Sequence, residues 1–161
     1  MAVAVVLAGC AAQERDRSGE PTPAPPTRTA QASPPAEELA LEAYRGMMGA
    51  LVDGSLEGAE DHPDLDGYAS GQALELTTAM LDGATATGEP VLRPQVVEAD
   101  LDGDPPQVVV EDCMDNSEWV LEGHPPREAS ARNTRLFVAT VTEQAGQWKV
   151  EELWLGEFDQ C

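Results

Sequence analysis

The sequence is poor in positive charge, in aromatic residues and in cysteine, and it has no long hydrophobic run. Its 161 residues hold 9 Lys and Arg against 30 Asp and Glu, which gives a formal net charge of -21 at pH 7. Nucleic-acid binding needs the opposite balance, because cationic side chains must replace the counterions on phosphate. No stretch reaches the roughly 20 apolar residues of a spanning helix, which argues against a transmembrane protein. The length allows one ordinary domain, and 42% hydrophobic residues suffice for its core.

The first ten residues contain a short hydrophobic run that ends in a cysteine. Residues 2–8 are all apolar, and Leu7-Ala8-Gly9-Cys10 places small residues directly before the thiol, as a signal peptidase requires. The segment resembles the lipobox of bacterial lipoproteins, in which the cysteine is lipidated and becomes the N-terminus. We therefore expect a signal over residues 1–9 and lipidation at Cys10; a buried strand ending in Gly-Cys is the competing interpretation. No Lys or Arg precedes the run, so we expect the true start to lie upstream.

Residues 10–36 predict a disordered linker. Proline fixes φ and removes amide donors, so neither a helix nor a central strand is expected here. The charges of this segment cancel, which leaves the negative charge on a predicted globular domain over residues 37–161. An anionic membrane surface repels such a domain over about 8 Å at physiological salt. The linker would hold the domain beyond that range, on the outer face of the cytoplasmic membrane. The prolines are Pro21, Pro23, Pro25, Pro26, Pro34 and Pro35.

Two cysteines, Cys113 and Cys161, remain once Cys10 is assigned to lipid. Cysteines of exported domains are usually paired, so we expect a disulfide between them. The chain-entropy model gives such a bridge roughly 4 kcal/mol of stabilisation. A metal site is the competing use, but two distant cysteines without a nearby histidine cannot complete a tetrahedral ligand set. A nucleophilic role for Cys113 would require it to be unpaired.

The first half of the domain has helical periodicity. One face of a helix over residues 36–53 carries apolar side chains, with Gly54 as its expected end. Pro63 opens a short helical turn that includes Leu65 and Tyr68. A third helix is expected from Gly71 to about Ala84, with Ser70 as its cap. The apolar face of the first helix consists of Ala40, Tyr44, Met47, Met48 and Leu51.

The second half is typical of antiparallel strands. Extended runs are expected over residues 91–97, 107–113, 119–121, 135–142 and 148–155. Asp102-Gly103 indicates a hairpin turn, and Ala145-Gly146 a second turn. A bulge is expected at Glu151-Glu152. Helices followed by strands predict an α+β fold, with the N-terminal helices packed in a curved antiparallel sheet of four to five strands.

Several segments carry a resemblance to a known family. They are residues 68–74 at the start of a helix, residues 88–91 before the sheet, Asp112 to Ser117 with Trp119 after a strand, Trp148 to Val150, and the terminal Cys161. In this order they resemble the nuclear transport factor 2-like (cystatin-like, SnoaL-like) domains of exported actinobacterial lipoproteins of unknown role. The resemblance implies a cone-like fold whose open end could hold a small molecule. It implies no reaction, because the fold carries enzymes and inert modules alike.

Two acidic clusters are candidate metal sites. Asp100, Asp102, Asp104 and Glu111 have the spacing of a calcium loop. Pro105, however, stands where that loop needs glycine, and a β-like run follows, so a hairpin turn explains these residues better. A second cluster, Asp61, Asp64 and Asp66 beside His62, is better explained as a solvated loop that caps a helix. We therefore expect no metal ligands and no cofactor.

Catalytic candidates are few. His62 and His124 both adjoin proline in expected loops and accompany no nucleophile motif. Isomerases and cyclases of the resembled fold use Asp, His or Tyr inside the cone. Asp112, Asp115 and Tyr44 are the candidates here, although the two aspartates are better explained as turn caps beside the disulfide. Trp119, Trp148 and Trp154 suggest core or rim packing, with ligand stacking as the alternative.

The sequence thus predicts a lipid-anchored, extracytoplasmic binding or interaction module without catalysis. Its partners would be the membrane, through the anchor, and a cationic protein or small ligand drawn by the negative charge. An isomerase-like or cyclase-like enzyme that uses the cone cavity is the alternative. A purely structural or immunogenic surface protein is a third hypothesis.

Overall fold

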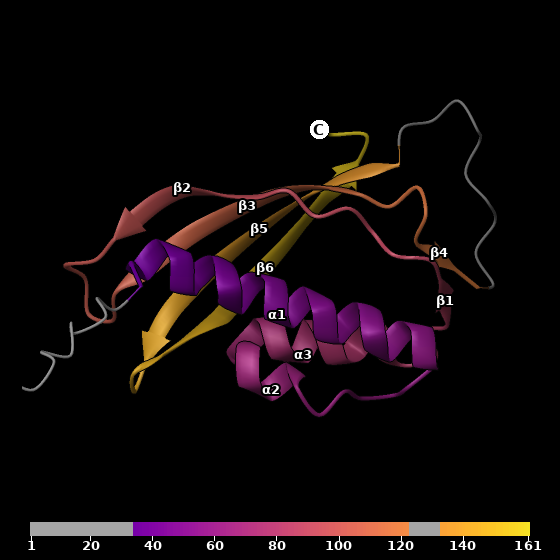
Figure 1. Ribbon diagram of the computed structural model, residues 1–161, viewed down its shortest axis with the longest axis horizontal. Helices are drawn as coiled ribbons and strands as arrows, with labels where there is room; N and C mark the ends of the chain where they lie inside the picture. The colour runs from indigo at the N-terminus through magenta and orange to yellow at the C-terminus, as the bar shows by residue number, and fades with distance from the viewer. Residues whose placement is uncertain (1–33, 123–132) are drawn as a thin grey trace, which may run out of the picture. The chain divides into compact units, whose positions relative to one another are not determined.

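The computed structural model describes residues 34–122 and 133–161, all of which belong to one compact unit, Ser33–Cys161. Three helices precede and cover one face of a four-stranded antiparallel sheet (Figure 1). A separate two-stranded sheet lies beside one end of the first helix. The predicted α+β class, with helices packed against antiparallel strands, is therefore confirmed. The predicted signal, the lipidation site Cys10 and most of the predicted linker lie outside the described residues.

Helix α1 (Ala36–Glu57) forms the centre of the core. Its first turn carries Glu37 and Glu38, whose charges suit the positive end of the helix dipole. The predicted end at Gly54 is wrong, because the helix continues for one more turn to a left-handed Gly58. Gly54 lies inside the helix instead, where a Cβ would come within 2.9 Å of the Leu81 side chain. Glycine at this position thus permits close packing between helices rather than a stop.

Two shorter helices complete the helical layer. Helix α2 (Leu65–Tyr68) lies at the predicted helical turn, and helix α3 (Gly71–Leu81) begins at Gly71 as expected. The third helix ends three residues before the predicted Ala84. The backbone N–H of Ser70 donates to the carbonyl oxygen of Val150 at 2.8 Å, which joins the start of α3 to the sheet. The buried side of α3 consists of Ala73, Thr77 and Leu81.

The main sheet has the strand order β2-β3-β5-β6 and is antiparallel throughout. Its strands are β2 (Pro94–Asp100), β3 (Gln107–Asp115), β5 (Thr134–Gln144) and β6 (Gln147–Phe158). Alternate residues of β3 and β5 face the helices, as the period of two in a strand requires. The buried inner face carries Val108, Val110, Asp112, Met114, Phe137, Ala139, Val141, Val150 and Leu153.

The predicted bulge of the sheet is present in the structure, but the predicted hairpin turn differs in length. The predicted bulge is confirmed, because Thr140 pairs with Glu152 and Val141 with Val150, which leaves Glu151 unpaired in the ladder. Strands β2 and β3 form the predicted hairpin, but the loop between them has six residues, 101–106, rather than a tight two-residue turn. Pro105 and Pro106 have no amide hydrogen, so they cannot extend the ladder toward Asp102-Gly103.

The predicted third strand leaves the main sheet. Strand β4 (Val120–Leu121) pairs instead with β1 (Ala86–Thr87), a short strand that the sequence pattern does not indicate. The backbone N–H of Glu122 also donates to the carbonyl oxygen of Thr85 at 2.7 Å. This small sheet brings Trp119 and Leu121 next to the C-terminal end of α1, where they line a cavity.

Candidate functional site

A phenol and a carboxylate meet inside the core. Tyr44 lies midway along α1, and Asp112 lies on the inner face of β3; both side chains are fully buried. The Tyr44 hydroxyl donates to Oδ2 of Asp112 at 3.1 Å, and the backbone N–H of Arg93 donates to Oδ1 at 2.8 Å. Each carboxylate oxygen therefore has a donor. We call these two residues the Tyr44–Asp112 pair.

Burial perturbs both members of this pair. Loss of solvent raises the pKa of Asp112, although the Arg93 N–H, the Tyr44 hydroxyl and the charges of Arg45 and Arg93 all oppose the rise. Burial raises the pKa of Tyr44 as well, and the charge and hydrogen bond of Asp112 raise it further. Perturbed acids of this kind are typical of general acid–base sites, but they also occur in structural networks. A general acid–base site must be open to a substrate, whereas a structural network need not be.

The neighbourhood of the pair is filled by side chains. Met47 and Met48 of α1 and Met114 of β3 are fully buried in the same core cluster. Neither Tyr44 nor Asp112 lines either of the two hollows described below. The structure therefore brings together two of the three acid–base candidates. Tyr44 and Asp112 point inward, so the interpretation of Asp112 as a turn cap is wrong.

Asp115, by contrast, caps a turn as expected. It lies on the opposite face of β3 from Asp112, and its Oδ1 accepts hydrogen bonds from the Ser117 backbone N–H at 3.0 Å and from the Ser117 hydroxyl at 2.6 Å. These bonds favour the ionised carboxylate and lower the pKa of Asp115. Asp115 is thus a local structural residue.

The cysteines of the domain meet on the outer side of β3. The sulfur atoms of Cys113 and Cys161 lie at disulfide distance, with 5.8 Å between the two Cα atoms. This agrees with the predicted pairing. The bridge ties the last residue of the chain to the strand that carries Asp112.

A cavity of about 270 Å³ lies between the C-terminal part of α1, the end of α3 and the small sheet. We call it the Trp119 cavity. The Trp119 indole is 8% exposed, and its Nε1–H donates to the Ser55 hydroxyl oxygen at 3.1 Å. The Ser55 hydroxyl in turn donates to the carbonyl oxygen of Val52 at 2.7 Å. The lining residues are Leu51, Ser55, Met80, Asp82, Gly83, Ala84, Trp119, Leu121 and Glu122.

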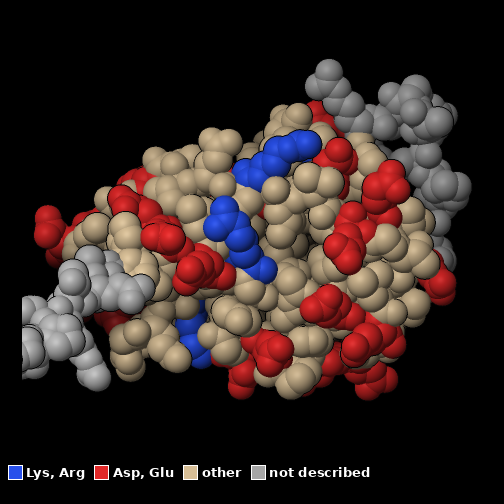
Figure 2. All heavy atoms as spheres, in the orientation of Figure 1, with Lys and Arg blue, Asp and Glu red and all other residues tan. Residues whose placement is uncertain are grey.

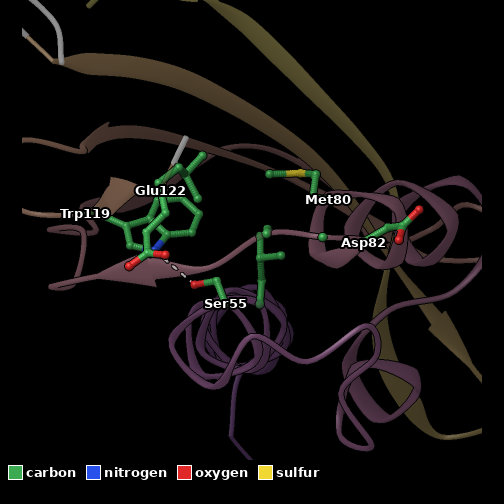
Figure 3. Close-up of a pocket in the computed structure, with 9 residues that line it drawn as sticks. Ser55, Met80, Asp82, Trp119 and Glu122 are labelled. Atoms are coloured by element: carbon green, nitrogen blue, oxygen red, sulfur yellow. Dashed lines mark hydrogen bonds between the residues drawn. The ribbon is translucent and has the colours of Figure 1, made fainter. Parts of the chain in front are cut away.

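The close-up shows how this cavity is built (Figure 3). Ser55 reaches from α1 toward Trp119, and Met80 lies across from them near the end of α3. The Glu122 carboxylate lies beside the Trp119 ring, whereas the Asp82 carboxylate points away from it. A second, wider hollow is an open depression on the outer side of α3, lined by Glu60, Leu74, Glu75, Thr78, Ala79 and Asp82.

The residues of the two acidic clusters lie on the β2–β3 hairpin and around the start of α2. Within residues 34–122 and 133–161, no group of three or more His, Cys, Asp or Glu residues is arranged to hold a metal ion. Glu111 pairs with Gln95 along β2 and β3, away from the loop that carries Asp102 and Asp104. In the other cluster, Nδ1 of His62 accepts the Asp64 N–H at 3.3 Å. His124 lies outside the described residues.

The surface of the described part is strongly acidic. Its Lys and Arg residues are Arg45, Arg93, Arg135 and Lys149. On the face drawn in Figure 2, the cationic side chains form a band across the middle, while Asp and Glu side chains occupy both ends. Two of the cations, Arg45 and Arg93, act on Asp112. Among the described residues on this face, Asp and Glu therefore predominate at the end that carries the small sheet.

Most residues that line the Trp119 cavity cannot be predicted from the sequence. Trp119 is a candidate for ligand stacking, but the sequence does not single out Ser55, Met80, Asp82 or Glu122. Ser55 is the detectable signal, because a hydroxyl on the buried face of a helix needs a partner when it lies within a core. Its partner, Trp119, is 64 residues away along the chain, so the sequence does not show the pairing.

Comparisons with known proteins add no site residues to this geometry. The chain matches no family model, and a search of curated proteins finds no significant match. In the part of the chain that the structure describes, no helix is both long and apolar enough to cross a membrane.

Proposed function

We propose that this protein is an exported lipoprotein whose acidic domain binds a small ligand without catalysis. Cys10 would carry the lipid, residues 10–36 would form the tether, and residues 37–161 would lie on the outer face of the cytoplasmic membrane. The lipobox-like Leu7-Ala8-Gly9-Cys10 supports the anchor. The Cys113–Cys161 pair at disulfide distance supports an oxidising compartment, because such bonds are rare in the cytosol.

The domain itself would be a nuclear transport factor 2-like module. The order of helices before antiparallel strands, with α1 packed across one face of the sheet, supports this relationship. The fold by itself implies no activity. The role of the domain must therefore come from its cavities and its polar groups.

One observation carries the binding role: the Trp119 cavity has an oriented aromatic wall, whereas the acid–base groups lie elsewhere. Ser55 holds the indole through a hydrogen bond, so the wall is preorganised for contact with a ligand. Apolar pockets with a few fixed polar groups are the usual form of small-molecule sites. The Tyr44–Asp112 pair is enclosed with methionines in the core and lines neither the cavity nor the depression.

Filling the cavity tests this proposal. Ala84 lines it and is partly exposed, so Ala84→Leu would occupy the space without disturbing the core. We expect compounds found by a thermal-shift screen of the full chain to lose their effect in Ala84→Leu. The control is Ala79→Leu, which adds the same side chain to the open depression on α3. Equal shifts in wild type and Ala84→Leu for every compound would contradict the proposal.

The Tyr44–Asp112 pair supports a second candidate, an isomerase-like or cyclase-like enzyme. A carboxyl and a phenol in hydrogen-bond contact could act as acid and base if a substrate reached them. The Tyr44→Phe variant distinguishes a binding module from an enzyme. In a binding module it lowers stability and leaves ligand affinity in the Trp119 cavity unchanged. In an enzyme it abolishes turnover of a bound ligand, which product analysis after incubation with the wild-type chain would reveal.

The intact mass of the native protein tests the proposed lipid anchor at the membrane. Native protein from its own membrane should have an intact mass that begins at Cys10 and includes an acyl adduct. A mass that begins at Met1 without an adduct would contradict the anchor. Cys10→Ser provides the matched control, because it should remove the adduct and release the protein from the membrane fraction.

A further inference from the structure

The size of the Trp119 cavity limits the class of ligand, if the proposed binding function on which this inference rests is right. The cavity, at about 270 Å³, lies just below the range of roughly 300–1,000 Å³ that holds drug-sized molecules. It therefore suits a molecule, or an end of a molecule, no larger than a long side chain.

The walls of the cavity offer apolar and aromatic contact and few free acceptors. Leu51, Met80 and Leu121 contribute aliphatic and thioether surface, and Trp119 is the one aromatic ring among the described lining residues. The Ser55 hydroxyl already donates to Val52 and accepts from Trp119. The Glu122 and Asp82 carboxylates are the remaining side-chain acceptors among the described lining residues, so a primary amine would exchange its three bonds to water for fewer bonds here.

The charge at the cavity is negative. Glu122 lines it with its carboxylate beside the Trp119 ring, and Asp82 lies at the opposite edge with its carboxylate turned outward (Figure 3). No Lys or Arg is among the described lining residues. An anionic ligand would meet repulsion both at the cavity and from the acidic surface around it, whereas a cation would be attracted by both.

We propose that the Trp119 cavity binds a small alkylammonium cation. Its N-methyl groups contact Leu51, Met80 and the Trp119 indole, and its charge is balanced by Glu122. A cation against a tryptophan ring gains electrostatic attraction, and a fully alkylated nitrogen has no hydrogen bonds to lose on leaving water. The aromatic wall and the carboxylate are both needed: the ring recognises the methylated head, and Glu122 distinguishes it from a neutral group of the same shape.

The probe is choline, and its matched neutral control is 3,3-dimethylbutan-1-ol, in which carbon replaces the nitrogen. The readout is the indole N–H resonance of Trp119 in the full chain, assigned with Trp119→Phe. Trp154, which is 53% exposed on β6, serves as the internal reference. We expect choline to shift the Trp119 signal saturably and to bind about two- to thirtyfold more tightly than the neutral compound.

Two variants test whether the Glu122 carboxylate contributes to choline binding. Glu122→Gln removes the carboxylate beside the ring and should weaken choline binding about two- to fivefold, the range of an exposed ion pair. Glu118→Gln removes the same charge from an exposed residue that does not line the cavity, so it should leave the affinity nearly unchanged. Both positions are exposed, so both variants should fold.

The outcomes separate this inference from the proposed function. If 3,3-dimethylbutan-1-ol binds as tightly as choline, or Glu122→Gln has no effect, the cavity binds ligands but the cationic class is wrong. If neither compound moves the Trp119 signal and no compound depends on Ala84, the binding function fails as well. Sedimentation with phosphatidylcholine vesicles identifies the source: vesicle binding that Glu122→Gln weakens and Glu118→Gln does not assigns the cation to a lipid headgroup, and a response to free choline alone assigns it to a solute. Either source supports the cationic class.

Discussion

Helix α1 makes two polar side-chain contacts through one face, and one of them is enclosed in the core whereas the other borders a cavity. Tyr44 and Ser55 are eleven residues apart, close to three helical turns, so both side chains project toward the strands. Tyr44 donates to Asp112 of the main sheet, and Ser55 accepts from Trp119 beside the small sheet. The first contact lies within packed side chains, and the second borders a cavity of about 270 Å³.

This difference shows that the Tyr44–Asp112 pair and the open Trp119 cavity lie in separate parts of the domain. The Tyr44–Asp112 pair is enclosed, and each oxygen of Asp112 is already bonded. The groups that border open space are a hydroxyl, an indole and aliphatic chains, together with acidic residues at the edge. The buried contact is suited to holding the sheet on the helix, and the other is suited to contact with a ligand.

The largest expected effect concerns the disulfide, which reinforces only the Asp112 side of this comparison. Cys113→Ser should lower stability by roughly 4 kcal/mol, the chain-entropy value for a loop of this length. Thermal unfolding with and without reductant would measure it. Reductant should reproduce the loss in wild type and have no effect on the variant. An unchanged melting temperature in oxidising buffer would mean that the cysteines are not paired.

A somewhat smaller loss is expected from Asp112→Ala. The change leaves the Tyr44 hydroxyl and the Arg93 N–H without a partner, and unsatisfied buried donors cost about 1–3 kcal/mol each. We expect a total loss of about 3 kcal/mol in urea unfolding. Asp115→Ala is the matched control at an exposed turn of the same strand, and its loss should be well below that of Asp112→Ala. Similar values for both variants would mean that the buried contacts of Asp112 add no more stability than an exposed turn cap does.

Ser55→Ala is the corresponding change at the other contact, and its effect should be smaller. It removes the acceptor of the Trp119 indole, but water in the adjacent cavity can take its place. We expect a loss of about 1 kcal/mol in urea unfolding, together with weaker ligand binding because the indole is no longer held. Ser55→Thr, which keeps the hydroxyl, should restore the Trp119 signal. A loss as large as that of Asp112→Ala would show that the Trp119 side is packed like the core.

The subtlest expected effect is the opposite pH dependence of two aspartates on β3. Asp112 has a pKa raised above 3.8 in the folded state, so it favours folding when protonated, and this contribution is lost as the pH rises through the folded pKa. Asp115 has a lowered pKa, so its contribution is present above 3.8 and is lost as the pH falls. The melting temperature of wild type minus that of Asp112→Asn should fall as the pH rises through the acidic range, whereas wild type minus Asp115→Asn should rise. If both differences changed with pH in the same direction, Asp112 would not be desolvated.

The local elements can be predicted to different degrees. The apolar repeat from Ala40 to Leu51 identifies α1, and the run from Arg135 to Thr142 identifies β5, because each pattern reflects which side of an element is buried. The end of α1 is missed, since glycine is typical of a helix end but also of a close approach such as that of Gly54 to Leu81. The bulge at Glu151 can be predicted, because two consecutive acidic residues interrupt an alternating strand.

The candidate site is harder to predict than the elements around it. Tyr44 and Asp112 are each candidates, but the choice between Asp112 and Asp115 depends on which face of β3 meets the helix. Strand β4 has only two residues, and nothing in so short a run indicates that it pairs with β1. The cavity beside it therefore cannot be anticipated, although Trp119 is conspicuous in the sequence.

By itself, the sequence determined the acidity of the protein, the helices followed by strands, and the small number of cysteines. These properties depend on composition or on short-range periodicity. Only the tertiary structure decided that Asp112 is enclosed with Tyr44 and that Ser55 orients Trp119 at the edge of open space. Those contacts join residues 68 and 64 positions apart, and long-range packing alone brings such residues together.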